Sequence, residues 1–142
     1  MARVVIIGNS AAGFSASQVL AEHRAGIEIT VISQEGCPAY KKNLLPQYVA
    51  SAINENELFL SDEGSYKQQG IDLLKGIKVA RIDTKRQAVV LKDNAKITYD
   101  WLIIASGCRI EIPDIPGRTK EGVYALDNLD DCLLYTSPSP RD

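Results

Sequence analysis

The chain has 142 residues, 16 lysines and arginines against 18 aspartates and glutamates, a formal net charge of −2, and 45% hydrophobic residues. This length predicts one domain with a hydrophobic core, and the near-neutral charge argues against nucleic-acid binding. No apolar run approaches the roughly 18 to 20 residues that cross a membrane, and the start lacks a signal-peptide layout, so we expect a cytoplasmic protein.

A strand–helix–strand unit is predicted at the amino-terminal end. Residues 3–7 (RVVII) form a continuous apolar run, typical of a strand buried on both faces of a parallel sheet. A glycine-containing loop follows at 8–13, and then a helix from Phe14 with Gly26 at its C-cap. Residues 27–33 (IEITVIS) are predicted to form the second strand, so the unit has the length of a parallel crossover.

The middle of the chain is predicted to be mostly loop and short helix. A loop at 35–43 precedes a short helix at 44–52, which tolerates Pro46 near its start. Asp62 is positioned to cap a further helix that runs to about Gln69, and a weaker strand follows at 72–74.

Four strand-like runs follow from residue 77. Residues 77–83, 87–92 and 96–100 are short, rich in β-forming residues and separated by turn residues, which indicates an antiparallel meander. Residues 101–105 (WLIIA) return to the apolar composition of a central parallel strand and lead into Ser106 and Gly107. These patterns predict an α/β fold with a parallel central sheet and a small antiparallel β-meander.

The loop GNSAAG at 8–13 is a variant of the G-x-G-x-x-G phosphate-binding pattern. In that pattern the first glycine makes a tight turn, the second admits a pyrophosphate, and the third lets the helix pack close to the sheet. Serine replaces the second glycine here, and its hydroxyl could itself bind a phosphate. The predicted phosphate-binding residues are Gly8, Asn9, Ser10, Ala11, Ala12 and Gly13.

Glu35 lies 22 residues after Gly13, just beyond the second predicted strand. A carboxylate at this place accepts hydrogen bonds from ribose hydroxyls and repels a 2′-phosphate, which favours FAD or NAD over NADP in this pocket. The alternative to a nucleotide site is that residues 8–13 form an ordinary glycine turn and that Glu35 is a surface residue.

Several segments together resemble the FAD-dependent pyridine nucleotide–disulfide oxidoreductase superfamily. They are GNSAAG at 8–13, PAYKKNLLPQYVAS at 38–51, YDWLIIASGCR at 99–109 with IPG at 115–117, and GVYALDNLDD at 122–131. The resemblance is to the NADH oxidase, rubredoxin reductase and nitrite-reductase-associated type and covers residues 1–131. It implies the first part of a Rossmann-like FAD-binding domain of the three-layer ββα type, incomplete here.

The resemblance assigns further cofactor contacts. It implies that residues 8–13 hold the FAD pyrophosphate, that Glu35 binds the adenosine ribose, and that the two strand-end turns lie at one edge of the sheet. The other positions that it implies are Lys42, Val79, Ala105, Ser106, Gly107 and Arg109. For Lys42 and Arg109 the alternative is a solvated surface side chain, and Tyr40 is interpreted as a packing residue.

The chain departs from many relatives at the position of a redox cysteine, where it has Asn43. An amide cannot form a sulfenate or a mixed disulfide. The chain has three cysteines without C-x-x-C spacing, Cys37, Cys108 and Cys132, which excludes a disulfide scaffold and a zinc ribbon. Because His23 is the single histidine, we also expect no metal site. We therefore expect no catalytic residue in this segment and a flavin-only carrier, in which NAD(P)H delivers hydride to FAD and electrons leave to a small or protein acceptor.

Residues 132–142 (CLLYTSPSPRD) show no helical or strand periodicity and resemble a translated sequencing adapter. We interpret them as a non-native tail, with an ordinary disordered terminus as the alternative. Residues 1–131 would then be an amino-terminal fragment without the NAD domain, inactive alone. The rival hypothesis is a single NAD-binding module, either a small dehydrogenase or a redox-sensing regulatory domain. The sequence gives no indication of an oligomeric state.

Overall fold

The computed structural model describes residues 1–23 and 25–136, which divide into two units. The first comprises Met1–Tyr40 and Phe59–Gly107, and the second comprises Lys41–Leu58 and the residues from Cys108 onward. Each unit is described by itself.

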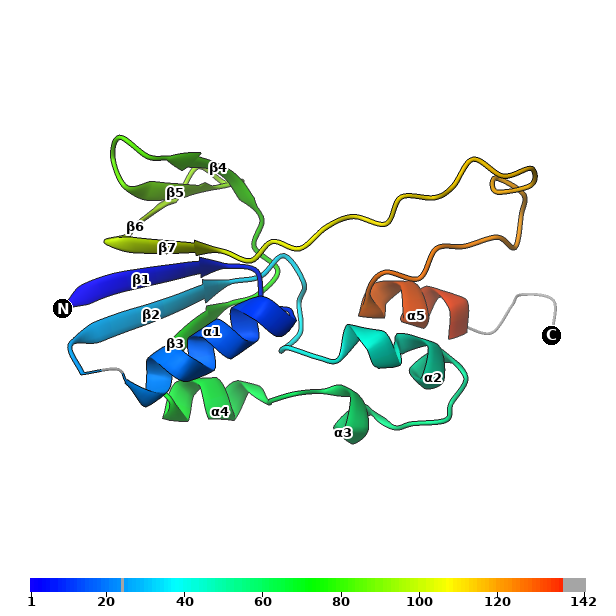
Figure 1. Cartoon of the computed structure of the whole chain (residues 1–142), viewed down its shortest axis with the longest axis horizontal. Coiled ribbons are helices and arrows are strands. Elements are labelled where there is room, and N and C mark those ends of the chain that lie inside the picture. Colours follow the sequence, from blue (N-terminus) through cyan, green and yellow to red (C-terminus); the bar gives the residue numbers. More distant parts are fainter. Residues whose placement is uncertain (24, 137–142) are drawn as a thin grey trace. The chain divides into compact units, whose positions relative to one another are not determined.

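A four-stranded parallel sheet forms the centre of the first unit (Figure 1). Its strands lie in the order β3-β2-β1-β7, and all three neighbouring pairs are parallel. The strands are β1 (Ala2–Ile7), β2 (Ile27–Ile32), β3 (Ile71–Leu74) and β7 (Trp101–Ile104). β1, β2 and β7 were predicted from their apolar composition and β3 as a weaker strand at 72–74, and the parallel central sheet is confirmed.

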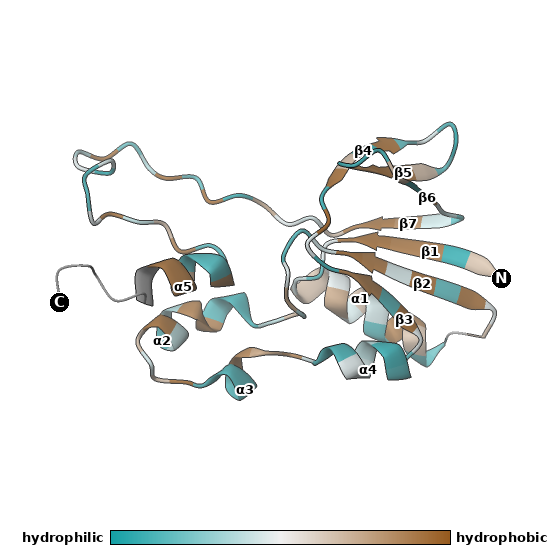
Figure 2. Ribbon diagram, turned by 180° about the vertical axis from the view of Figure 1, so that it is seen from behind, coloured by the Kyte–Doolittle hydropathy of each residue, from teal (hydrophilic) through white to brown (hydrophobic). Residues whose placement is uncertain are grey.

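The sheet is covered on both faces, which explains why its strands are hydrophobic along most of their length (Figure 2). Side chains alternate between faces along a strand. Val4 and Ile6 pack with residues of α1 (Ala11–Glu22) and with Tyr66 of α4 (Glu63–Gln68), whereas Val5 belongs to the cluster on the opposite face. That second cluster joins the sheet to the meander.

The meander consists of β4 (Val79–Asp83), β5 (Ala88–Leu91) and β6 (Lys96–Thr98), paired antiparallel in this order. All four residues of β5 are buried, and Val89 and Leu91 pack with Val5 and Ile32 of the parallel sheet. Meander, parallel sheet and helices therefore form the three layers of the predicted ββα type (Figure 1).

Helix α1 differs from the prediction at both ends. It begins at Ala11 rather than Phe14, because Ser10 already occupies the N-cap and its carbonyl accepts the Phe14 N–H at 2.9 Å. It ends at Glu22 with the exposed His23 at the C-cap, so the predicted cap at Gly26 is wrong. Gly26 has φ +77° and instead leads directly into β2.

The second unit is mainly helical. Its elements are η1 (Lys42–Leu44), α2 (Leu45–Val49), α3 (Glu55–Leu58) and α5 (Leu129–Thr136), and α2 packs against α5. The predicted helix at 44–52 is shorter than expected, and α3 was not predicted. Within the described part of the chain, no helix has the length and apolarity of a membrane span.

Helix α5 corrects the expectation that regular structure ends before Cys132. The Asn128 side chain accepts the Asp131 N–H at 3.0 Å, and the Asp131 carboxylate accepts the Asn128 N–H at 3.1 Å, a reciprocal cap that starts the helix. Cys132 is buried, and the helix runs to Thr136. Residues 137–142 of the predicted tail lie outside the described residues, and its foreign origin stays a prediction.

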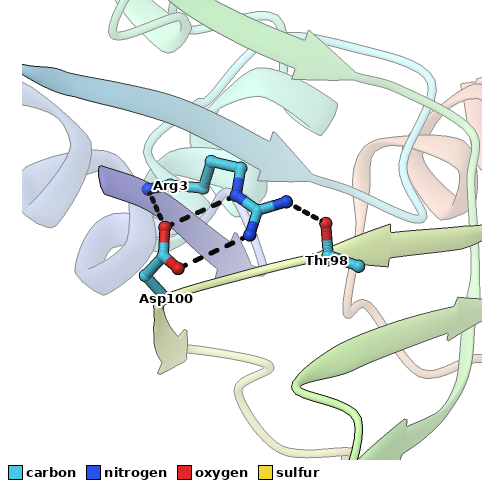
Figure 3. Close-up of polar contacts among 3 residues, drawn as sticks. All are labelled: Arg3, Thr98 and Asp100. Atoms are coloured by element: carbon cyan, nitrogen blue, oxygen red, sulfur yellow. Dashed lines mark hydrogen bonds and ion pairs between the residues drawn. The ribbon is translucent and has the colours of Figure 1, made fainter. Parts of the chain in front are cut away.

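Arg3 and Asp100 connect the starts of β1 and β7 (Figure 3). The Arg3 backbone N–H donates to Oδ2 of Asp100 at 2.7 Å, and the guanidinium contacts both carboxylate oxygens at 3.4 Å and also the Thr98 hydroxyl. These hydrogen bonds hold the pKa of Asp100 below its ordinary value. The bond from the Arg3 backbone has the largest effect, and those from the Arg3 side chain come next.

We expect Asp100→Asn to lower the melting temperature at neutral pH but not in strong acid. Because the folded-state pKa of Asp100 is lowered, its stabilising contribution is present above about pH 4 and is lost as the pH falls through that pKa. Thermal unfolding of both proteins between about pH 2 and pH 7 measures this effect. Asp72→Asn, at an exposed position on β3, is the control. A gap between wild type and Asp100→Asn that does not change with pH would contradict the explanation.

Candidate cofactor-binding edge of the sheet

The turns after β1 and β7 lie against each other. The two strands are neighbours, and the Ala105 N–H donates to the Ile7 carbonyl at 2.8 Å. Gly8 has φ +104°, and a Cβ built on it would lie 2.1 Å from the Ala105 carbonyl oxygen and 3.2 Å from the Cα of Ser106. The prediction that both glycine-containing turns share one edge of the sheet is therefore confirmed.

Gly13 lets helix α1 begin directly on this turn. A Cβ at Gly13 would lie 1.9 Å from the Gly8 carbonyl oxygen and 3.4 Å from the Cβ of Ala105. Only glycine permits such an approach of helix to strand end, which is the packing role predicted for it.

Ser10 occupies the place of the middle glycine without strain. Its φ of −91° and ψ of −165° are extended values that serine adopts freely, and as N-cap it makes no side-chain capping hydrogen bond. The first turn of α1 carries no acidic residue. The amides and the positive end of the helix dipole at this terminus suit an anion such as a diphosphate.

Glu35 is fixed just beyond the end of β2. Its N–H donates to the Ser33 hydroxyl at 3.2 Å, and its carbonyl accepts the Gly76 N–H at 3.0 Å. Its carboxylate oxygen Oε2 accepts a hydrogen bond from the Tyr40 hydroxyl. The interpretation of Tyr40 as a packing residue was therefore incomplete. Its ring packs against Phe59, and its hydroxyl also donates to the Glu35 carboxylate, the group predicted to bind the ribose.

A buried contact that was not predicted holds the glycine loop. The Tyr66 hydroxyl donates to Oδ1 of Asn9 at 3.1 Å and accepts the Ala39 N–H at 3.3 Å. Burial raises the pKa of the Tyr66 phenol, so it remains a neutral donor. Asn9 Nδ2 is buried with no partner among the described residues. Only the placement of α4 against α1 and β1 brings these residues together.

The remaining predicted contacts fall in both units. Val79 begins β4 and packs with the meander-side core, and Ala105, Ser106 and Gly107 follow β7 in the first unit. Lys42 begins η1, and Arg109 is exposed; both belong to the second unit, as does Asn43. The cofactor contacts of all these residues stay predictions.

The three cysteines differ in exposure. Cys37 is half-buried and Cys108 is exposed. Cys132 is buried, and burial raises the pKa of its thiol, which lowers the thiolate fraction at neutral pH. Within residues 1–23 and 25–136, no group of three or more His, Cys, Asp or Glu side chains could hold a metal ion.

Comparison with known proteins identifies the family. A sequence model described as pyridine nucleotide-disulphide oxidoreductase matches residues 2–140. This chain belongs to that family. Its relatives include the assimilatory nitrate reductase electron transfer subunit of Bacillus subtilis, 34% identical over 131 residues, which cover 92% of this chain and 17% of that protein. Rhodocoxin reductase of Rhodococcus erythropolis is 34% identical over 135 residues, 94% of this chain and 32% of that protein.

Solved structures of the family have the same fold. The NADH:rubredoxin oxidoreductase of Clostridium acetobutylicum superposes with a TM-score of 0.79 at 27% identity, over 94% of this chain and 34% of that one. The chain thus spans between 17% and 34% of the length of these relatives.

Pyridine nucleotide-disulphide oxidoreductases use FAD and NAD(P)H. The residues present fit the FAD part of that requirement. A Cβ at Gly8 would collide with the backbone of the Ala105 turn, and a Cβ at Gly13 would collide with the Gly8 carbonyl. Ser10 is unstrained with a hydroxyl that makes no capping bond, and Glu35 is held beyond β2.

Proposed function

We propose that this chain is the amino-terminal part of the FAD-binding portion of an NAD(P)H-dependent flavin oxidoreductase. Bound FAD would accept hydride from NAD(P)H and pass electrons on to an acceptor. This segment would bind and orient the adenine dinucleotide part of FAD, and the remaining domains would come from the longer protein that the relatives' lengths indicate.

The observation that carries the proposal is the meeting of the two glycine-containing turns at one sheet edge. Parallel strands place their carboxyl ends at the same edge, where nucleotides bind in open α/β sheets. β1 ends there in Gly8, β2 in the segment with Glu35, and β7 in Ala105. The meander on the opposite face from α1 also favours this class over a single NAD-binding module, which does not account for it.

In the proposed enzyme, each group has a task that follows from its chemistry. The amino-terminal amides of α1 would bind the diphosphate, and the Glu35 carboxylate the ribose hydroxyls. Lys42 and Arg109 would add charge-assisted hydrogen bonds to phosphate oxygens. Val79 and Ala105–Gly107 would contact the cofactor through their backbone.

The proposed acceptor is an electron-carrier protein. Relatives include a benzene 1,2-dioxygenase system ferredoxin–NAD(+) reductase subunit of Pseudomonas putida and the NADH:rubredoxin oxidoreductase, whose names state such acceptors. Asn43 at the redox-cysteine position supports a flavin-only route, because an amide cannot carry electrons as a thiol pair does.

We expect the 142-residue chain alone to bind FAD weakly or not at all and to show no NADH turnover, because most of the proposed enzyme is missing from it. We call the longer protein, encoded by the native gene without the predicted foreign tail at 132–142, the protein from the uninterrupted reading frame. It is expected to be yellow and to oxidise NAD(P)H with an artificial electron acceptor. Gel filtration with absorbance detection, followed by turnover assays, compares the two. Tight stoichiometric FAD on the short chain would contradict the first expectation, and a colourless long protein that binds NAD would favour the single NAD-binding module.

A further inference from the structure

We propose that Tyr40 is a positioning residue that fixes the Glu35 carboxylate for the hydroxyls of an adenosine ribose. The Tyr40 hydroxyl donates to Oε2 of Glu35 within the first unit. The inference rests on the proposed function, since Glu35 has this task only if an adenine dinucleotide binds there. Recognition of the ribose would then depend on a tyrosine–glutamate pair rather than on a lone glutamate.

Tyr40 is itself held in place, which makes it a fixed donor. Tyr40 is 5% exposed, and its ring meets the Phe59 ring edge-on, with centroids 6.2 Å apart and an interplanar angle of 73°. The backbones of these two residues also form an antiparallel bridge. A buried aromatic ring has few rotatable bonds, so its hydroxyl stays at one place on the edge.

The Tyr40 contact orders a part of Glu35 that its backbone bonds do not fix, because those bonds hold only the start of its side chain. Ser33 and Gly76 hold the Glu35 N–H and carbonyl, but the half-buried side chain has three rotatable bonds of its own. Ordering these bonds during folding rather than on binding increases affinity. A carboxylate accepts about four hydrogen bonds, so it can bind a tyrosine and ribose hydroxyls together.

The test uses Tyr40→Phe in the protein from the uninterrupted reading frame, prepared without flavin. Phenylalanine keeps the ring against Phe59 and removes only the donor. We expect the affinity for ADP to fall about tenfold, equivalent to roughly 1.4 kcal/mol. The affinity for 2′,3′-dideoxy-ADP, which lacks the ribose hydroxyls, is expected to change less than about twofold. Titration calorimetry measures all four combinations of protein and ligand.

Tyr48→Phe is the matched control. It makes the same chemical change at another tyrosine that donates to a glutamate, Glu55, at 3.4 Å in the second unit, and it should leave both affinities unchanged. Glu35→Gln provides a second variant. Combined with Tyr40→Phe, it should show losses of ADP affinity that do not add, because both changes remove one coupled pair.

The outcomes separate this inference from the proposed function. If Tyr40→Phe weakens both ligands equally, or neither, Tyr40 has no positioning role, while FAD binding by the wild type leaves the proposed function intact. If the wild type binds neither FAD nor ADP, the proposed function fails and this inference with it. Should Tyr40→Phe not fold, Glu35→Gln alone must weaken ADP and spare the dideoxy ligand; an equal effect on both overturns the inference.

Discussion

Gly13→Ala is expected to lower the free energy of unfolding by about 3 kcal/mol or more. The new Cβ would lie 1.9 Å from the Gly8 carbonyl oxygen, which belongs to the backbone and cannot rotate away as a side chain can. Relief therefore requires α1 to move away from the end of β1. Denaturant unfolding followed by circular dichroism measures the loss.

Gly36→Ala is the control, because a Cβ there meets no atom within 4 Å and φ is not positive. We expect a change within about 0.5 kcal/mol. Gly8→Ala should cost at least as much as Gly13→Ala, since a clash of 2.1 Å adds to a φ of +104°. If Gly13→Ala were as stable as the control, the close contact of Gly13 with the Gly8 carbonyl would not exist in solution.

Tyr66→Phe is expected to cost about 2 to 3 kcal/mol although the aromatic ring remains. The ring still packs against Phe14, whose centroid is 6.0 Å away. Loss of the hydroxyl leaves the buried Ala39 N–H and Oδ1 of Asn9 without a partner. Thermal or denaturant unfolding measures the cost, and the double variant Asn9→Ala with Tyr66→Phe should recover part of it, because removing both members leaves fewer unpaired groups.

The alkaline pH dependence gives an independent check of Tyr66. Its folded-state pKa is raised above the ordinary value of 10.0, mainly by burial. Its contribution to stability is thus full below about pH 10 and is lost as the pH rises through the raised pKa. Tyr66→Phe should lose less stability than the wild type over that range, whereas equal losses would show that the phenol is not buried in solution.

The strands of the sheet could be predicted because their signal is local. The runs at 3–7 and 101–104 are apolar along almost their whole length, as expected of central strands in a parallel sheet, and they proved to be neighbours in the sheet. The loop at 8–13 and the acidic residue at 35 were likewise recognisable from composition and spacing. The helix boundaries were predicted less accurately than the strands. α1 begins three residues earlier than predicted because Ser10 serves as its N-cap.

Long-range polar contacts could not be predicted, because no local pattern marks them. The bond between Tyr66 and Asn9 joins residues 57 positions apart, and Tyr40 was recognisable only as an aromatic residue in a loop. No helix was predicted after Asp131 because those residues lack periodicity, yet the reciprocal cap of Asn128 and Asp131 starts a helix that continues through Cys132.

The sequence by itself determined the strands, the first helix and the kind of ligand that the glycine loop suits, because each follows from residues close together in the chain. Tertiary structure alone decided how closely the Gly8 turn approaches the Ala105 turn within their shared edge, and that a tyrosine holds Glu35. These contacts depend on the order of strands in the sheet and on the layer that each segment joins, which side-chain packing across the whole unit selects.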